Sequence, residues 1–145
     1  MAFLLKTEIL INSTPEKVWA ILTDFKNYPT WNPFVTSLTG DFEVGKKIKV
    51  RIEPPEAKAN NFEPTITTFE PNKKLSWLGV FLMRGVFDGE HKFELTDNGN
   101  GTTTLVQSEN FAGLLVPLFK KMLNDNTRRG FEAMNKKVKE LAEKQ

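Results

Sequence analysis

Two periodicities of hydrophobic and polar positions divide the chain into strand-like and helix-like segments. Residues 3–11 alternate with period two, which is typical of a strand with one buried face. Residues 13–25 instead place apolar side chains at helical spacing, after Thr14 as N-cap and Pro15 at the first helical position. Two prolines in residues 27–34 interrupt this pattern. The sequence therefore predicts a strand, a short amphipathic helix and an irregular helical turn.

From residue 35 to residue 111 the period of two returns, and turn signals rich in Gly, Pro, Asn and Asp separate the segments. The predicted strands include residues 47–53, 62–69, 74–81, 87–95 and 102–111. Strands joined by turns, without intervening helices, favour an antiparallel meander. In residues 113–145 the apolar residues again have helical spacing, with Pro117 at a position where a helix could begin. We therefore predict a single α+β domain over residues 1–145, in which a helix covers one curved sheet.

Composition excludes several classes of protein. A formal net charge of +2 gives little reason to expect nucleic-acid binding. The chain has no cysteine and one histidine, so disulfides, thiolate chemistry and multi-histidine metal sites are excluded, and we expect no metal and no cofactor. No apolar run approaches the roughly 20 residues of a membrane span, and the N-terminus lacks the features of a secretory signal. We expect a cytoplasmic protein without an integral membrane segment, monomeric by default.

The C-terminal helix has an unusual apolar face. At 100° per residue, Asn126, Thr127 and Gly130 fall in the middle of the face that carries the large apolar side chains. Small and polar residues at this level indicate that helix and sheet stand apart, as a ligand cavity requires. The alternative is a bend near Gly130, with Asn126 hydrogen-bonded to backbone. Both interpretations remain open from the sequence.

The single histidine, His91, lies on the apolar face of the strand over residues 87–95. It could be a packed core residue, a catalytic base, or a polar anchor inside a ligand cavity. The turn at residues 97–101 predicts a hairpin with the strand that follows. In the register we expect, the opposed pairs are Leu95 with Thr103, Phe93 with Leu105, His91 with Gln107, and Gly89 with Glu109.

This register gathers His91, Gln107 and Glu109 on the inner face, with Asn126 able to approach from the helix. A shift of one residue would turn Gln107 and Glu109 outward, and alternation alone does not exclude it because Leu105 and Val106 are both apolar. A buried imidazole needs a partner, and a buried carboxylate needs a cation, a donor network or water. The pair could also perform acid/base chemistry. No Ser-His-Asp order, glycine-rich phosphate loop or metal set accompanies it, so we favour a structural or ligand-anchoring histidine over a catalytic one.

The order of elements resembles the START-like helix-grip superfamily (SRPBCC), which includes polyketide cyclase/dehydrase-like proteins and plant hormone receptors. The resemblance is carried by STPEKVWAILTDFKNYPTWNPF, FDGEHKFEL, GTTTLVQSENFAGLLVP and TRRGFEAMNKKVKELAE, points to a bacterial branch, and spans Phe3 to Ala142. It implies a seven-stranded curved antiparallel sheet around a long C-terminal helix, with two short helices after the first strand. In the plant receptors the strand matching SENF turns its glutamate inward, which supports the register placing Glu109 beside Gly89.

The resemblance also implies a cavity between the sheet and the C-terminal helix for a small hydrophobic ligand such as a lipid, sterol or polyketide-like molecule. Ligand binding is therefore the leading hypothesis. The alternative is a polyketide cyclase/dehydratase-like enzyme using His91 or Glu109 as acid/base, and a third is a protein-interaction module. Residues 81–87 and 111–119 are interpreted as entrance loops or as packed corners. The predicted ligand-binding residues are Trp31, Ile52, Ile66, Trp77, Phe87, His91, Phe93, Gln107, Glu109, Phe111, Asn126 and Gly130.

Overall fold

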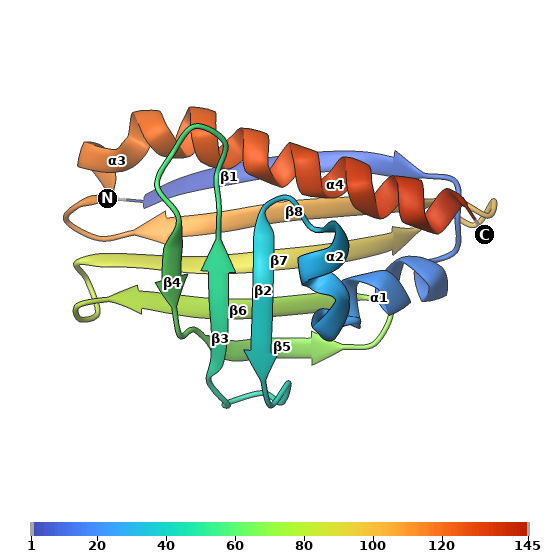
Figure 1. The fold of residues 1–145 in the computed structure, drawn as a ribbon, viewed down its shortest axis with the longest axis horizontal. Coiled ribbons are helices and arrows are strands. Elements are labelled where there is room, and N and C mark those ends of the chain that lie inside the picture. Colours follow the sequence, from blue (N-terminus) through green and yellow to red (C-terminus); the bar gives the residue numbers. More distant parts are fainter. Residues whose placement is uncertain (1, 145) are drawn as a thin grey trace.

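A five-stranded antiparallel sheet forms the main layer of the computed structural model, which describes residues 2–144 (Figure 1). The strand order is β1 (Ala2–Ile11), β8 (Thr103–Ala112), β7 (Phe87–Asp97), β6 (Lys74–Phe81) and β5 (Thr65–Glu70). Each of these strands is antiparallel to its neighbours. The meander predicted for the second half of the chain is thus present, and β1 closes it by pairing along the full length of β8.

A second sheet of three strands lies in front of the first, and its strands cross those of the larger sheet (Figure 1). It contains β2 (Val35–Gly40), β3 (Ile48–Ile52) and β4 (Asn60–Phe62). The predicted single seven-stranded sheet is therefore wrong, because the described residues form eight strands in two sheets. An isolated bridge between Lys47 and Thr65 links the sheets. Pro64 beside this bridge has no N–H to donate, which prevents a continuous ladder.

The predicted helices are present. Two short helices, α1 (Pro15–Thr23) and α2 (Tyr28–Trp31), follow β1, separated by the 3₁₀ turn η1 (Phe25–Asn27). Thr14 caps α1 by accepting from the Lys17 N–H, as the sequence predicted. The C-terminal segment comprises α3 (Val116–Met122), the π-helical turn η2 (Leu123–Thr127) and α4 (Arg128–Glu143), and Pro117 lies in the first turn of α3. Within residues 2–144, no helix is both long and apolar enough to span a membrane.

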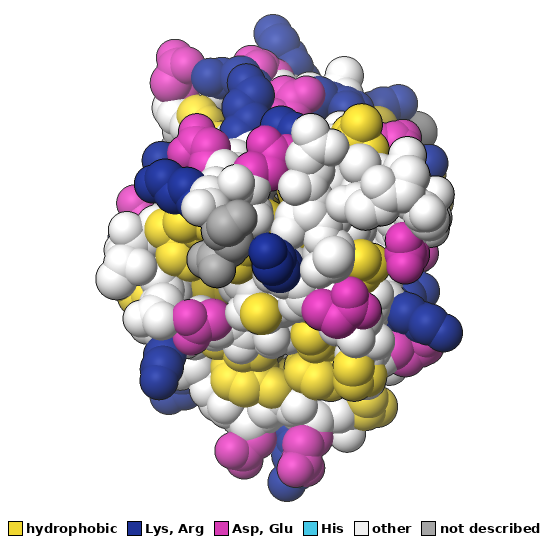
Figure 2. All heavy atoms as spheres, turned by 90° about the vertical axis from the view of Figure 1, so that its right-hand side faces the viewer, with side chains coloured by type: hydrophobic (Ala, Val, Ile, Leu, Met, Phe, Trp, Pro, Cys, Tyr) yellow, Lys and Arg dark blue, Asp and Glu magenta, His cyan; other side chains and the backbone are white. Residues whose placement is uncertain are grey.

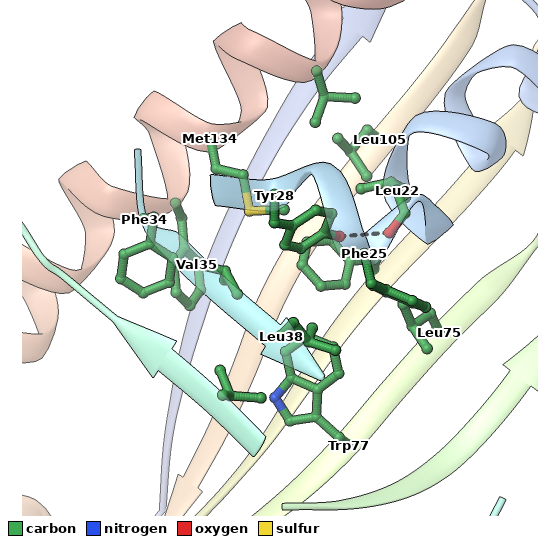
Figure 3. Close-up of a cluster of buried hydrophobic side chains, with 14 of the residues drawn as sticks. Leu22, Phe25, Tyr28, Phe34, Val35, Leu38, Leu75, Trp77, Leu105 and Met134 are labelled. Carbon is green, nitrogen blue, oxygen red and sulfur yellow. Dashed lines mark hydrogen bonds between the residues drawn. The ribbon is translucent and has the colours of Figure 1, made fainter. Parts of the chain in front are cut away.

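The main hydrophobic core lies between the two sheets and α4, as Figure 3 shows for one cluster of its side chains. Tyr28 is fully buried there, and its hydroxyl donates to the main-chain oxygen of Leu22. Burial raises the pKa of Tyr28, and the nearby Asp24 carboxylate adds to that effect. The phenol is therefore a neutral hydrogen-bond donor in the folded protein.

Tyr28→Phe should lower the free energy of unfolding by about 1 kcal/mol at neutral pH, because the Leu22 carbonyl loses its side-chain donor. A raised pKa favours the protonated phenol in the folded state. Its contribution is thus present below the ordinary tyrosine value of 10.0 and is lost as the pH rises above it. Because Tyr28 is the only tyrosine, tyrosinate absorbance should increase only together with alkaline unfolding measured by circular dichroism. Ionisation of Tyr28 in the folded protein near pH 10 would contradict this prediction.

Candidate functional site

The β7–β8 hairpin places His91 opposite Glu109 and Phe93 opposite Gln107. The expected register, with His91 opposite Gln107, is therefore wrong by two residues. Because side chains alternate with period two, a shift of two keeps the same residues on the inner face. The difference arises at the loop of residues 98–102, where the Asn98 side-chain amide donates to the Thr102 and Thr104 hydroxyls and holds a longer loop than a tight turn.

His91 is hydrogen-bonded at both ring nitrogens. Its Nδ1 lies 2.9 Å from Glu109 Oε1, and its Nε2 lies 2.9 Å from Gln107 Oε1. The Gln107 amide nitrogen in turn donates to Asn135 Oδ1 at 2.7 Å and to the Phe131 main-chain oxygen at 3.3 Å. A chain of polar side chains thus runs through the interior of the fold. It leads from Glu109 on β8 to His91 on β7, returns to Gln107 on β8 and continues to Asn135 on α4.

The donor and the acceptor of each hydrogen bond in this chain can be assigned by starting from Thr7 and Asn135. Asn135 Nδ2 donates to Thr7 Oγ1 at 2.9 Å, and the Thr7 hydroxyl donates to the Gln107 main-chain oxygen at 2.8 Å. Asn135 Oδ1 is then the acceptor for Gln107, so Gln107 Oε1 is the acceptor for His91. His91 Nε2 must therefore carry a hydrogen.

A second hydrogen must lie between His91 and Glu109, because a bare ring nitrogen and a carboxylate oxygen at 2.9 Å would repel each other. The pair is either an imidazolium beside a carboxylate or a neutral imidazole beside a carboxylic acid. Both arrangements have zero net charge, which allows the pair to be buried without a further counter-ion. The side chain of His91 is 5% exposed and that of Glu109 is 18% exposed. Glu109 is therefore the more solvent-accessible member of the pair, although both lie on the inner face of the sheet.

The imidazole ring is also held by aromatic side chains. Trp77 stacks on it with ring centroids 5.2 Å apart and an interplanar angle of 17°, while Phe131 contacts it edge-on at 4.8 Å. Phe93 lies at 4.8 Å on the same strand. Both ring nitrogens of His91 are thus hydrogen-bonded to protein groups and its ring is packed among three aromatic side chains, so His91 has no free nitrogen to offer a ligand.

Gly89 makes room for the carboxyl group of Glu109. The two residues are diagonal neighbours on the inner face, and a Cβ added at Gly89 would overlap Glu109 Oε2 and contact the Phe111 ring at 3.4 Å. A side chain at position 89 would therefore push Glu109 away from His91. Gly89 and His91 are two residues apart in β7 and so share its inner face, where glycine permits this close approach.

The structure brings together some of the predicted ligand-binding residues and separates others. His91, Trp77, Phe93, Gln107 and Glu109 form one contact group, and Phe87 and Phe111 stack beside it at 5.9 Å. Outside the hydrogen-bonded chain, Trp31 packs on Tyr28 at 5.2 Å, Ile66 is buried opposite Trp77, and Ile52 pairs with Val35 at the end of β3.

Asn126 and Gly130 do not behave as the cavity interpretation expected. Asn126 does not approach His91, because its Nδ2 donates to the Pro55 main-chain oxygen at 2.8 Å and holds the loop between β3 and β4. Gly130 packs against Phe34, so that a Cβ added there would lie 2.8 Å from Phe34 Cε1 and 3.1 Å from Phe34 Cγ. The small residue at position 130 thus admits the ring of Phe34, which comes from the connection between α2 and β2 and fills the space that the cavity interpretation left open.

Asn135 and Thr7 are the residues of the site that the sequence interpretation missed. Asn135 is 2% exposed and takes the place expected for Asn126. It lies four residues after Phe131 and three before Val138, so helical periodicity alone could have placed it on the buried face. Thr7 faces inward in β1, and its role depends on β1 pairing with β8, which no local pattern indicates.

The inner faces of β6, β7 and β8 end near α3, the β6–β7 turn and the β8–α3 connection, on the left in Figure 1. We call this end the mouth and define it by Phe81, Phe87, Glu109 and Phe119. Phe81 pairs with Phe87 across β6 and β7, and Phe87 lies 5.4 Å from Phe119 of α3. Phe87, Glu109 and Phe119 are partly buried, while Phe81 is exposed. The mouth thus combines three aromatic side chains with one carboxyl group.

Two hollows on other parts of the surface contain none of the predicted ligand-binding residues. One, of about 380 Å³, lies over β2, β3 and β4 beside Lys49, Arg51 and Phe62. The other, of about 390 Å³, lies beside Phe25, Phe42 and Phe69. Within residues 2–144, no three acidic or histidine side chains gather in a way that could hold a metal ion. The mouth is therefore the part of the inner face where exposed and partly exposed aromatic side chains occur together with the partly accessible Glu109 carboxyl group.

Comparisons with known proteins agree with this fold. The family model described as polyketide cyclase / dehydrase and lipid transport matches residues 3–143. No curated protein matches the chain. The family match and the solved structures below confirm the resemblance to the START-like superfamily.

Similar solved structures include the Zhui aromatase/cyclase from Streptomyces sp. R1128, with a TM-score of 0.80 and 14% identity over 99% of this chain and 95% of the other. Norcoclaurine synthase from Thalictrum flavum, in complex with dopamine and hydroxybenzaldehyde, has a TM-score of 0.76 and 12% identity over 99% and 88%. A START superfamily protein from Mycobacterium smegmatis has a TM-score of 0.73 and 17% identity over 97% of each chain. At these identities the likeness establishes a shared fold.

Proposed function

Because this chain belongs to the polyketide cyclase / dehydrase and lipid transport family, we propose that it binds a small hydrophobic molecule carrying a hydroxyl or carbonyl group. The observation that carries the proposal is the Glu109 carboxyl group, which is partly accessible at the base of the aromatic mouth and is held by the buried His91. Apolar walls with one oriented polar group are the usual composition of a small-molecule site.

The binding site we propose is the mouth, and not the middle of the fold. Phe34, Phe93 and Phe131 are fully buried and occupy the space between α4 and the sheet at the level of Gly130. Towards the mouth the side chains are more exposed, and the aromatic rings of Phe87 and Phe119 meet at a tilt of 43°. A flat ligand would displace contacts between these rings and place its polar group against Glu109.

Each member of the polar chain has a separate role in this proposal. Glu109 contacts the ligand, whereas His91 is a positioning residue because both of its nitrogens are already bonded. Gln107 keeps the hydrogen on His91 Nε2 and so leaves Nδ1 to face Glu109. The sequence left three interpretations of His91 open: a core residue, a catalytic base and a polar anchor in a ligand cavity. A positioning role makes His91 a buried core residue that orients the polar group of the site.

Binding of 2-naphthol compared with naphthalene tests the proposal. Both probes offer the same apolar rings, and only 2-naphthol has a hydroxyl. Glu109→Gln should weaken 2-naphthol binding by about tenfold relative to naphthalene, as expected for loss of a hydrogen bond to a charged or acidic group. Probe fluorescence and native mass spectrometry would measure the two affinities.

The matched control is Glu94→Gln, which removes a carboxylate from the outer face of the same strand as His91. It should leave both affinities unchanged. Equal loss of naphthalene and 2-naphthol binding in Glu109→Gln would mean that Glu109 only supports the fold. Failure of both probes to bind the wild-type protein would overturn a site for small aromatic molecules at the mouth.

The hydrogen shared by His91 and Glu109 favours a second candidate function, an acid/base enzyme of the cyclase or dehydratase kind. In this account the Glu109 carboxylate removes a proton next to a carbonyl and later returns it, while His91 holds the carboxyl group in place. The ketone 2-tetralone is a probe with such protons. Accelerated deuterium exchange next to its carbonyl, absent in Glu109→Gln, would support the enzyme. Exchange no faster than in buffer without protein would support ligand binding without catalysis.

A further inference from the structure

An exposed hydrophobic surface lies next to the mouth. We call it the apolar tip and define it by Val80, Phe81, Leu82, Met83, Leu114 and Leu118. All six side chains are exposed, with Leu82 at 80% and Leu114 at 82%. Large apolar side chains gathered at this exposure are unusual on a protein surface and mark a site of interaction.

Two separate segments are joined to form this surface. The Leu114 N–H donates to the Gly85 oxygen and the Leu115 N–H to the Val86 oxygen, each at 3.0 Å. These bonds hold the β8–α3 connection against the β6–β7 turn, which lie together at the left end of Figure 1. Leu82 at the turn has a positive φ of 67°, an unfavourable backbone conformation for leucine. Leu82 adopts this backbone conformation although its side chain is mostly exposed to solvent.

The charges around the apolar tip are basic. Arg84, Lys120 and Lys121 belong to the two segments, whereas residues 79–87 and 111–124 contain no Asp or Glu. Asp88 at the start of β7 is buried and accepts from the Gly85 N–H at 3.1 Å, and its ion pair with Arg84 at 3.7 Å leaves that side chain 71% exposed. Figure 2 shows the opposite end of the molecule, where acidic and basic side chains are intermixed.

We propose that the apolar tip docks on the surface of an anionic lipid bilayer. Leucine, methionine and phenylalanine side chains would enter the interfacial region, and the three cations would contact lipid phosphates, which is the combination that interfacial membrane binding requires. Phe81 belongs to both the tip and the mouth, so docking brings the mouth to the membrane. This last consequence rests on the proposed function, whereas docking itself does not.

Charge complementarity favours a bilayer over a second copy of this chain. Two copies meeting tip to tip would each bring Arg84, Lys120 and Lys121, and neither segment offers a carboxylate to pair with them. Fluid lipid adapts to a projecting turn, and its anionic headgroups supply the missing negative charge. The tip thus has the features of a membrane-facing surface.

Co-sedimentation with lipid vesicles tests the proposal. The wild-type protein should bind vesicles of phosphatidylcholine mixed with phosphatidylglycerol, and bind pure phosphatidylcholine vesicles far more weakly. Leu82→Ser/Met83→Ser and Arg84→Gln/Lys120→Gln/Lys121→Gln should each lower binding to the anionic vesicles by at least about tenfold. High salt should weaken the binding of the wild-type protein.

Matched controls come from the rest of the surface. Leu10→Ser removes an exposed leucine of β1, and Lys136→Gln/Lys137→Gln removes two exposed charges of α4, and both should leave vesicle binding unchanged. Absence of binding to anionic vesicles, or equal binding by the Leu82→Ser/Met83→Ser variant, would overturn the proposal. A dimer that this variant dissociates in gel filtration, without vesicle binding, would assign the tip to self-association instead. Measuring 2-naphthol binding in the same variant keeps the two proposals distinguishable, because it should be retained even where docking is lost.

Discussion

Gln107→Leu should lower the free energy of unfolding by about 2–4 kcal/mol, because it leaves several buried polar groups without a partner. The His91 Nε2–H loses its acceptor, Asn135 Oδ1 loses its donor, and the Phe131 oxygen loses its side-chain donor. Gln107 and the Phe131 side chain are fully buried, and Asn135 is 2% exposed, so water cannot easily replace these bonds. Urea unfolding followed by circular dichroism measures the change.

Asn110→Leu is the matched control, since it also replaces an amide by leucine on β8 but at an exposed position. It should change stability by less than about 0.5 kcal/mol. Thr7→Val should fall between the two variants, because it removes a hydroxyl that donates to Gln107 and accepts from Asn135. A loss in Gln107→Leu no greater than in Asn110→Leu would show that the polar chain contributes nothing to stability.

Gly130→Ala should lower the free energy of unfolding by about 1–2 kcal/mol, although alanine is the better helix former by up to about 1 kcal/mol. The added methyl group would overlap the Phe34 ring, which is held edge-on against Phe131 at 5.4 Å. Phe34 is 1% exposed, so its ring is enclosed by other protein groups. Thermal unfolding of the variant measures the change.

A double-mutant cycle with Phe34→Leu identifies the cause of that loss. In the Phe34→Leu background the methyl group at position 130 meets a smaller side chain, so Gly130→Ala should cost at least about 0.5 kcal/mol less there. An unchanged cost in the two backgrounds would assign the effect to the helix backbone. A stabilising Gly130→Ala in the wild-type chain would restore the interpretation that helix and sheet stand apart.

The local structure of this protein could be predicted from neighbouring residues alone. The cap at Thr14 and the helical spacing after it place α1, and alternation places β7 and its buried histidine. These features depend on backbone periodicity and on hydrogen bonds within a few residues, both of which are encoded locally. The order of these elements also predicted an α+β domain, and the START-like resemblance then supplied the helix-grip arrangement of sheet and C-terminal helix, which the family match and similar structures support.

Features that depend on distant residues were predicted less well. The register of β7 and β8 differed by two residues, because the alternating pattern fits equally well after any even shift. The split into two sheets occurs beside Pro64, where an isolated bridge between Lys47 and Thr65 replaces a continuous ladder. The partner of Gln107 proved to be Asn135 and not Asn126, since the packing of α4 against β1 and β8 decides which amide reaches it.

The sequence by itself thus determined the elements and the inward position of His91, because these follow from periodicity, while the START-like resemblance supported Gln107 and Glu109 on the same face. Only the tertiary structure decided what these side chains do. It joined them to Asn135 and Thr7 in a chain that sets the hydrogens on His91, and it placed Phe34 in the space beside Gly130. It also left Glu109 partly accessible at the mouth. These outcomes depend on contacts between residues far apart in the chain, which helical and strand periods do not specify.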